Sequence, residues 1–223
     1  MLRSLGNPRA SSGLANLVLF DNPTEIPYRR GWASGRTAST HLSRVEDVVR
    51  FYAGKLGKPI WLMGHSAGSI SITETYKRLQ AKNQESLIAG LIYSAGVVGT
   101  SFNDKSTLLP VLVMHHENDE CVSTTPAHAA KIHAGLKEAG NQEAEFALIK
   151  TGQRDPGGRD ACISGFHMYQ GASAGVAQVI AIPGPAPQPA LTGAVNRFAG
   201  RRYKGIHRKV QSQQRRHRRC LHN

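Results

Sequence analysis

The sequence predicts an α/β fold, a mostly parallel sheet flanked by helices. Short, continuous apolar runs alternate with longer segments whose apolar residues recur at helical intervals. Strands that are apolar throughout are typical of parallel sheets, because helices cover both faces of such a sheet. At 223 residues the chain can bury one sizeable core, so we expect a single domain over residues 1–182.

Five apolar runs predict the strands of this sheet: 14–20, 59–63, 87–93, 108–114 and 144–149. Four further segments predict helices: 41–56, 67–81, 126–139 and 175–182. Glycines at 57 and 140 can end the first and third of these helices, and Thr124 or Thr125 can cap the start of the third. Strands and helices therefore alternate along most of the chain.

The chain changes character after residue 182. Residues 183–189, with the sequence PGPAPQP, have the composition of a linker. Residues 197–223 contain ten Lys or Arg and no acid, and the remainder of the chain is nearly balanced in charge. We predict that residues 183–223 form a linker and a basic, disordered tail. The tail could bind nucleic acid or an anionic surface through its charge, but we favour a solvated extension because it lacks a recognisable fold.

Several classes of protein are disfavoured by what the sequence lacks. No run is long enough for a membrane-spanning helix, and the three cysteines form no C-x-x-C pair. His115, His116, Glu117 and Asp119 lack the H-E-x-x-H spacing, and neighbours on a strand point to opposite faces. We therefore expect no metal and no cofactor, with His116 instead at the rim of the site described next.

The segment Gly64-His65-Ser66-Ala67-Gly68 lies between a predicted strand and a predicted helix. A G-x-S-x-G pattern in this position predicts a serine held on a sharp, strained turn, with the glycines allowing strand and helix to pack closely. The pattern recurs at 171–175, around Ser173, but no buried strand precedes it there. No acid follows residue 160 either, so we take Ser66 as the candidate nucleophile.

A nucleophilic serine needs a general base and a group that orients the base. In an α/β sheet both should lie at the carboxyl ends of later strands. Asp119 follows the strand at 108–114, and His167 follows the strand at 144–149. Asp104 is an alternative acid.

This arrangement resembles the α/β-hydrolase superfamily over roughly residues 14–182. The resemblance rests on the turn at Ser66, the H-x-x-x-D-x-x-V loop that begins at His115, and the loop at His167. It implies Ser66 as nucleophile, His167 as general base and then acid, Asp119 as the residue that orients it, and the Ala67 N–H as an oxyanion donor. The implied activity is hydrolysis of a small-molecule carboxylic ester through an acyl-enzyme, without a cofactor; an acyltransferase uses the same triad.

The family takes its second oxyanion donor from a glycine-rich loop after an earlier strand. Only about 16 residues precede the predicted strand at 17–20, so we expect a fold that lacks its first strands. The rival hypothesis is therefore a truncated, catalytically impaired homologue with a binding role or none.

Cys121 lies two residues after Asp119, and Cys162 lies five residues before His167. Contact between Asp119 and His167 would bring the two cysteines close, either as a disulfide or as two unpaired thiols. We assign no signal peptide, and the chain as it stands suggests a cytoplasmic protein. A disulfide would instead favour a periplasmic or secreted protein whose signal sequence was lost.

Overall fold

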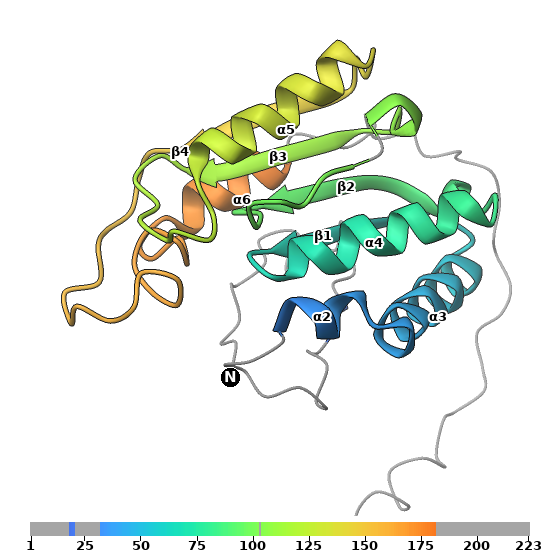
Figure 1. Ribbon diagram of the computed structural model, residues 1–223, viewed down its shortest axis with the longest axis horizontal. Coiled ribbons are helices and arrows are strands. Elements are labelled where there is room, and N and C mark those ends of the chain that lie inside the picture. Colours follow the sequence, from blue (N-terminus) through green and yellow to red (C-terminus); the bar gives the residue numbers. More distant parts are fainter. Residues whose placement is uncertain (1–17, 21–31, 103, 182–223) are drawn as a thin grey trace, which may run out of the picture. The chain divides into compact units, whose positions relative to one another are not determined.

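A four-stranded, fully parallel sheet is the centre of the fold. The structure is a computed structural model that describes residues 18–20, 32–102 and 104–181. The strands, in the order β1-β2-β3-β4 across the sheet, are β1 (Ile60–His65), β2 (Ile88–Ser94), β3 (Val111–His116) and β4 (Ala144–Ile149) (Figure 1). The predicted α/β class and parallel sheet are confirmed.

The helices connect and flank these strands. They are α2 (Trp32–Thr37), α3 (Ser39–Leu56), α4 (Gly68–Ala81), α5 (Pro126–Glu138) and α6 (Ser173–Ala181), with the short 3-10 turns η1 (Glu85–Leu87) and η2 (Asp104–Ser106). Gly57 ends α3 in the left-handed conformation, with φ of 61°, as glycine does most readily. Thr125 caps α5 by accepting a hydrogen bond from the His128 N–H. Helix α2 was not predicted, because its six residues are too few for a helical period to be recognised.

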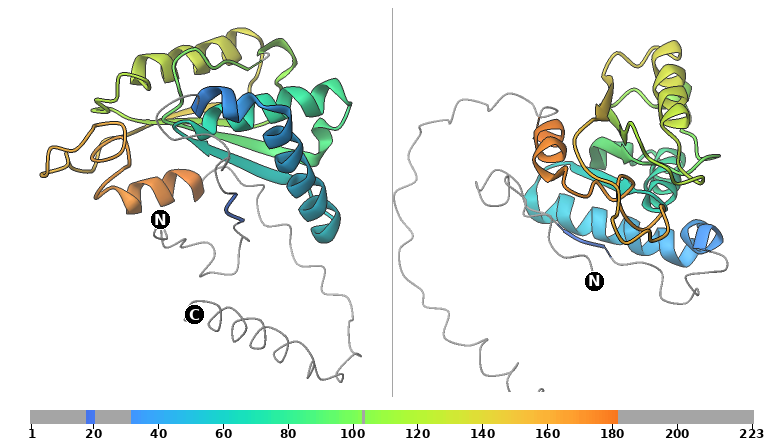
Figure 2. Two further views of the ribbon diagram at one scale, coloured as in Figure 1. Left: turned by 60° about the horizontal axis from the view of Figure 1, so that its bottom comes forward. Right: turned by 90° about the vertical axis from the view of Figure 1, so that its left-hand side faces the viewer.

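Both faces of the sheet are covered. Alternate residues of β2 and β3 point to opposite faces, so Leu91 and Tyr93 pack with α3, α4 and α5, whereas Ile92 packs with α6. Figure 2 shows α6 (orange) and α5 (yellow-green) on opposite sides of the sheet. Two hydrophobic cores, one on each face, therefore explain why the strand sequences are apolar throughout.

The predicted strand at 14–20 is wrong where it is described. Residues 18–20 lie outside the sheet and are exposed, and residues 14–17 lie outside the described part of the chain. An apolar run becomes a strand only where a neighbouring edge pairs with its N–H and C=O groups. Among the described residues β1 pairs with β2 alone, so its other edge receives no such strand.

Other sequence-based expectations fall outside the described residues. The linker and basic tail at 183–223 belong to this group, so they stay predictions. No helix in the described ranges is both long enough and apolar enough to cross a membrane.

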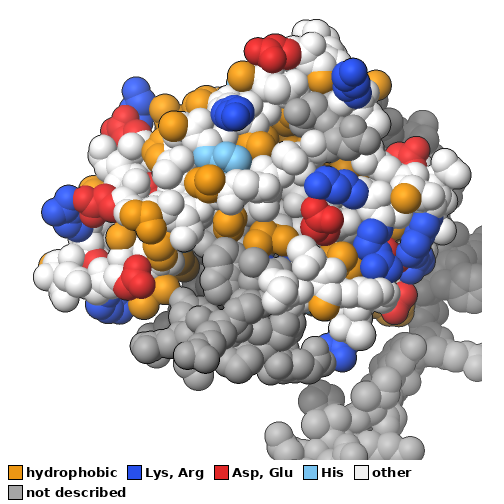
Figure 3. Space-filling view, viewed as in Figure 1, with side chains coloured by type: hydrophobic (Ala, Val, Ile, Leu, Met, Phe, Trp, Pro, Cys, Tyr) orange, Lys and Arg blue, Asp and Glu red, His pale blue; other side chains and the backbone are white. Residues whose placement is uncertain are grey.

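A buried carboxylate fastens α3 to α4. Glu46 of α3 is 1% exposed and pairs with Arg78 (2.7 Å), Lys82 (2.5 Å) and Arg50 (2.9 Å). Figure 3 shows Lys and Arg side chains interspersed with Asp and Glu over this part of the molecule. Burial alone would raise the pKa of Glu46, but the hydrogen bonds from Lys82, Arg78 and Arg50 outweigh it and lower the pKa to about 2.

Replacing Glu46 by Gln should lower the free energy of unfolding at pH 7 by about 2 kcal/mol. The partly exposed cations are screened by solvent, which keeps this figure below the full value of the pKa shift. Because the folded-state pKa is depressed, the stabilisation is present above the unfolded-state pKa of about 4.3 and is lost as the pH falls towards 2. Urea denaturation of the wild type and the variant at pH 7 and at pH 3 measures the difference in the free energy of unfolding at each pH.

The matched control is Glu74→Gln, which removes the half-exposed pair of Glu74 with Lys77 on α4. It should change the stability by no more than about 0.5 kcal/mol. An equal loss in both variants, or a Glu46 effect that does not diminish at acidic pH, would contradict the assignment.

Candidate functional site

The carboxyl ends of the parallel strands meet at one edge of the sheet. Ser66 follows β1 directly, Asp119 lies in the turn after β3, and His167 lies in the loop between β4 and α6. The three residues therefore belong to the same edge, although about a hundred residues separate the first from the last.

Ser66 occupies a strained turn. Its φ of 52° lies in the left-handed region, which costs a non-glycine residue on the order of 1 kcal/mol. The Ser66 N–H donates to the Ser94 carbonyl of the neighbouring strand (2.9 Å), and the Ser66 carbonyl accepts from the Ser69 N–H (2.9 Å). These two backbone bonds hold the turn, and the serine side chain is left half-buried.

The two glycines beside Ser66 have different reasons to be there. A Cβ on Gly64 would collide with the carbonyl of Gly68, so strand and helix pack here as closely as the sequence suggested. A Cβ on Gly68 would meet no atom within 4 Å, so the same prediction is wrong for Gly68. Close packing is needed only on the strand side of the turn.

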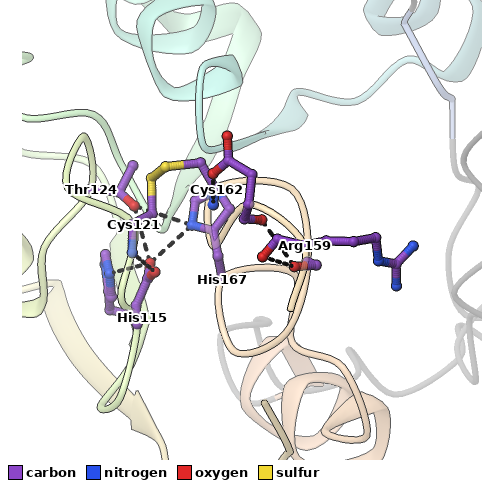
Figure 4. Close-up of a disulfide and its surroundings, with 9 residues drawn as sticks. His115, Cys121, Thr124, Arg159, Cys162 and His167 are labelled. Carbon is purple, nitrogen blue, oxygen red and sulfur yellow. Dashed lines mark hydrogen bonds and ion pairs between the residues drawn. A yellow bond between two sulfur atoms is a disulfide. The ribbon is translucent and has the colours of Figure 1, made fainter. Parts of the chain in front are cut away.

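The side chains of Asp119 and His167 are hydrogen-bonded to each other and fully buried. The distance from His167 Nδ1 to Asp119 Oδ2 is 2.9 Å, and Oδ2 also lies 2.9 Å from His115 Nε2 and 3.0 Å from Thr124 Oγ1. The Cys121 N–H donates to the other carboxylate oxygen (2.9 Å). Figure 4 shows His115, Thr124 and His167 close together, as their bonds to the same carboxylate oxygen require. Burial opposes ionisation, but the bonds from His115 and His167 outweigh it and hold the pKa of Asp119 far below its ordinary value.

This bond determines the proton positions on His167. A carboxylate can only accept, so Nδ1 carries the hydrogen and neutral His167 has its lone pair on Nε2. That nitrogen is buried and contacts no hydrogen-bonding group in the described part of the chain. The structure thus brings Asp119 and His167 together, whereas no hydrogen bond joins Ser66 to His167.

His65, the residue before Ser66, packs against His167 and Tyr169. Its ring lies 5.0 Å from the ring of His167, and its Nδ1 lies 3.1 Å from the buried Ser94 hydroxyl. That hydroxyl also contacts the Tyr169 hydroxyl (3.0 Å). Burial and the neighbouring His167 lower the pKa of His65 to about 3, so it is neutral at pH 7. His65 therefore places an uncharged ring beside the ring of His167.

Cys121 and Cys162 form a disulfide (Figure 4), with their Cα atoms 4.6 Å apart. The bond joins the turn that carries Asp119 to the loop that carries His167. Of the two states left open by the sequence, the structure contains the disulfide.

The remaining sequence candidates lie elsewhere. Asp104 belongs to η2, whose Ser106 bonds Gln80 near the end of α4, at the opposite end of the helix from Ser66. His116 is 1% exposed and stacks on Phe166, so its predicted place at the rim is wrong. Ser173 begins α6 and is exposed. Among the described residues no three His, Cys, Asp or Glu are grouped to hold a metal ion.

Sequence reasoning did not place His115 or Thr124 in contact with Asp119, although both bond to it; Thr124 was considered only as a helix cap, a position that Thr125 occupies. The available signal was the alternation of side chains along β3: when His116 points to one face, His115 points to the other. The path of the turn after β3 determines whether His115 or His116 points towards Asp119. The strand pattern does not contain this path.

A cavity of about 220 Å³ borders His167. Its lining includes the ion pairs of Glu120 with Arg154 and Asp155 with Arg159, but not Ser66. The cavity therefore adjoins the base His167 but does not reach the serine of the strained turn.

Comparison with known proteins adds little to this geometry. No protein-family model matches the sequence, and no curated protein matches it. The structure is similar to a solved crystal structure of a thermostable esterase, with 18% identity and a TM-score of 0.40. The likeness covers 60% of this chain and 33% of the esterase, so the chain spans about a third of that protein's length.

Replacing Gly64 by Ala should destabilise the protein by about 3 kcal/mol or more, because the new methyl group meets backbone that cannot rotate away. Gly68→Ala, the matched control four residues away, should be neutral or stabilising by up to about 1 kcal/mol, since space is open and alanine favours the helix. Thermal and urea denaturation of both variants test this, and equal effects would contradict the packing at the turn.

Removing the disulfide by the double substitution Cys121→Ser and Cys162→Ser should cost about 2–4 kcal/mol, because it releases a constraint on a 41-residue separation in the unfolded chain. A reductant should lower the melting temperature of the wild-type protein to about that of the double variant. The same reductant should leave the double variant unchanged, and a wild-type melting temperature insensitive to reduction would argue against the bond.

Proposed function

We propose that the protein is a serine hydrolase that cleaves carboxylic esters through an acyl-enzyme intermediate, with Ser66 as nucleophile and His167 as general base. The observation that carries this proposal is the buried Asp119–His167 hydrogen bond at the edge of the sheet where Ser66 lies on its strained turn. That bond leaves the lone pair of His167 on Nε2, the nitrogen that can accept a proton.

In this reaction Ser66 Oγ attacks the ester carbonyl carbon while its proton passes to His167 Nε2. The tetrahedral intermediate then collapses, the C–O bond to the alcohol breaks, and the imidazolium returns the proton to the leaving oxygen. Water repeats the sequence on the acyl-serine and releases the acid. Asp119 remains ionised throughout and stabilises the imidazolium, as its depressed pKa favours.

Two further conditions apply to the substrate complex. Ser66 Oγ has to come within about 2.6–3.2 Å of His167 Nε2, a contact that often forms only when substrate is bound. The oxyanion needs donors, and the Ala67 N–H donates to no acceptor in the described part of the chain, which leaves it available for this role.

The test is turnover of p-nitrophenyl acetate and butyrate, together with labelling by a fluorophosphonate probe. Ser66→Ala should abolish labelling and lower turnover at least about 1000-fold, because the nucleophile is lost. Ser173→Ala is the matched control, since it changes the serine of the second G-x-S-x-G pattern, at 171–175. Its turnover should stay within about twofold of the wild type.

Labelling that persists in Ser66→Ala would remove the nucleophile assignment. A wild-type protein that is folded by circular dichroism yet neither labelled nor active would contradict the proposed hydrolase.

A further inference from the structure

Asp119 binds two buried histidines, and the proposed reaction uses only one of them. Both His167 Nδ1 and His115 Nε2 lie 2.9 Å from the same oxygen, Oδ2, and the side chains of all three residues are 0% exposed. His167 lies on a loop, whereas His115 lies on β3. A second histidine on this oxygen therefore needs an explanation of its own.

The hydrogen-bond partners determine the state of His115. Its Nε2 must carry a hydrogen, because the carboxylate of Asp119 can only accept. Its Nδ1 is buried and has no partner in the described residues, and a hydrogen there would be an unsatisfied buried donor. His115 is therefore the neutral Nε2–H tautomer, which donates one hydrogen bond to Asp119.

His115 also provides the rigid side of the contact. It is the penultimate residue of β3 and pairs in register with Leu148 of β4, so its backbone belongs to the sheet. Asp119 lies in the turn that follows, where the Cys121 N–H and the Thr124 hydroxyl hold it from within the same segment. The bond from His115 is what ties the carboxylate to the sheet.

We propose that His115 is a positioning residue for the hydrolase reaction: its Nε2–H orients Asp119 Oδ2 towards His167 and takes up part of the carboxylate charge. The inference rests on the proposed function, in which His167 is the base. A carboxylate that shares its charge with a second donor stabilises the imidazolium of His167 less than a carboxylate bonded to His167 alone. Removing the donor should therefore make His167 more basic and misalign it at the same time.

Other titratable groups lie near this cluster. His65, Tyr169 and His128 face it from the β1 turn, the segment before α6 and helix α5. Burial lowers the pKa of both histidines and raises that of the tyrosine, and His115 adds a smaller lowering effect on the two histidines. On the cavity side the charged groups are paired: Glu120 with Arg154 and Asp155 with Arg159. A change in the pH profile would then report the His115 bond.

The experiment compares His115→Asn with His115→Gln in the full chain. A glutamine amide reaches the place of Nε2 and can donate to Asp119, whereas the shorter asparagine amide reaches only the place of Nδ1. His115→Asn should lower kcat about 10- to 100-fold with KM within about twofold. It should also raise the acidic midpoint of the kcat/KM profile by about half a pH unit. His115→Gln should recover most of kcat and the wild-type midpoint.

Equal losses in both variants with an unmoved acidic midpoint would overturn the proposal, since packing alone would then explain the residue. Wild-type behaviour of His115→Asn would also overturn it. Nitrogen-15 NMR of the wild-type imidazoles gives a second measurement that needs neither variant to fold nor any activity. It should find His115 neutral with its hydrogen on Nε2, and a hydrogen on Nδ1 instead would refute the bond to Asp119.

The proposed function and this inference fail in different ways. Absence of wild-type turnover and of Ser66 labelling would reject the hydrolase, whereas the NMR tautomer still decides whether His115 holds Asp119. An active enzyme whose kcat and pH profile are unchanged in His115→Asn would reject only the positioning role.

Discussion

The candidate site depends on one buried charge, the carboxylate of Asp119. An ionised carboxylate without partners is too costly to keep inside a protein, so the surrounding chain has to supply donors. It supplies four: two imidazole N–H groups, one hydroxyl and one backbone N–H, drawn from β3, the turn that contains Asp119, and the loop before α6. Satisfying the carboxylate therefore also brings these segments to one place, and the disulfide between Cys121 and Cys162 joins two of them covalently.

A second buried carboxylate shows what is particular about this one. Glu46 is also kept ionised, but its partners are Arg50, Arg78 and Lys82, which carry a permanent charge and reach it from a partly exposed surface. Asp119 instead accepts hydrogen bonds from two imidazoles, a hydroxyl and a backbone N–H, none of which carries a permanent charge. The first arrangement fastens α3 to α4, whereas the second joins β3 to the turn after it and to the loop before α6. The same solvation problem is therefore met by charged side chains in one place and by neutral hydrogen-bond donors in the other.

Much of this could be predicted from local patterns. The four observed strands follow from continuous apolar runs and the four longer helices from helical spacing, because both patterns depend on neighbours close in sequence. The positions of Ser66, Asp119 and His167 at one edge follow from their places after three strands, β1, β3 and β4, of one parallel sheet. The strand expected at 14–20 had the same apolar signal, but among the described residues the sheet offers it no pairing.

The sequence by itself therefore determined the class of fold, the order of its elements and the three candidate site residues, Ser66, Asp119 and His167. Only the tertiary structure decided that His115 rather than His116 meets Asp119, and that Gly64 rather than Gly68 is needed for close approach. It also decided that Cys121 pairs with Cys162. Each of these choices depends on atoms that are distant in sequence or on the path of a turn. Periodicity describes which way a residue faces along its own element, but what it meets there is set by long-range packing.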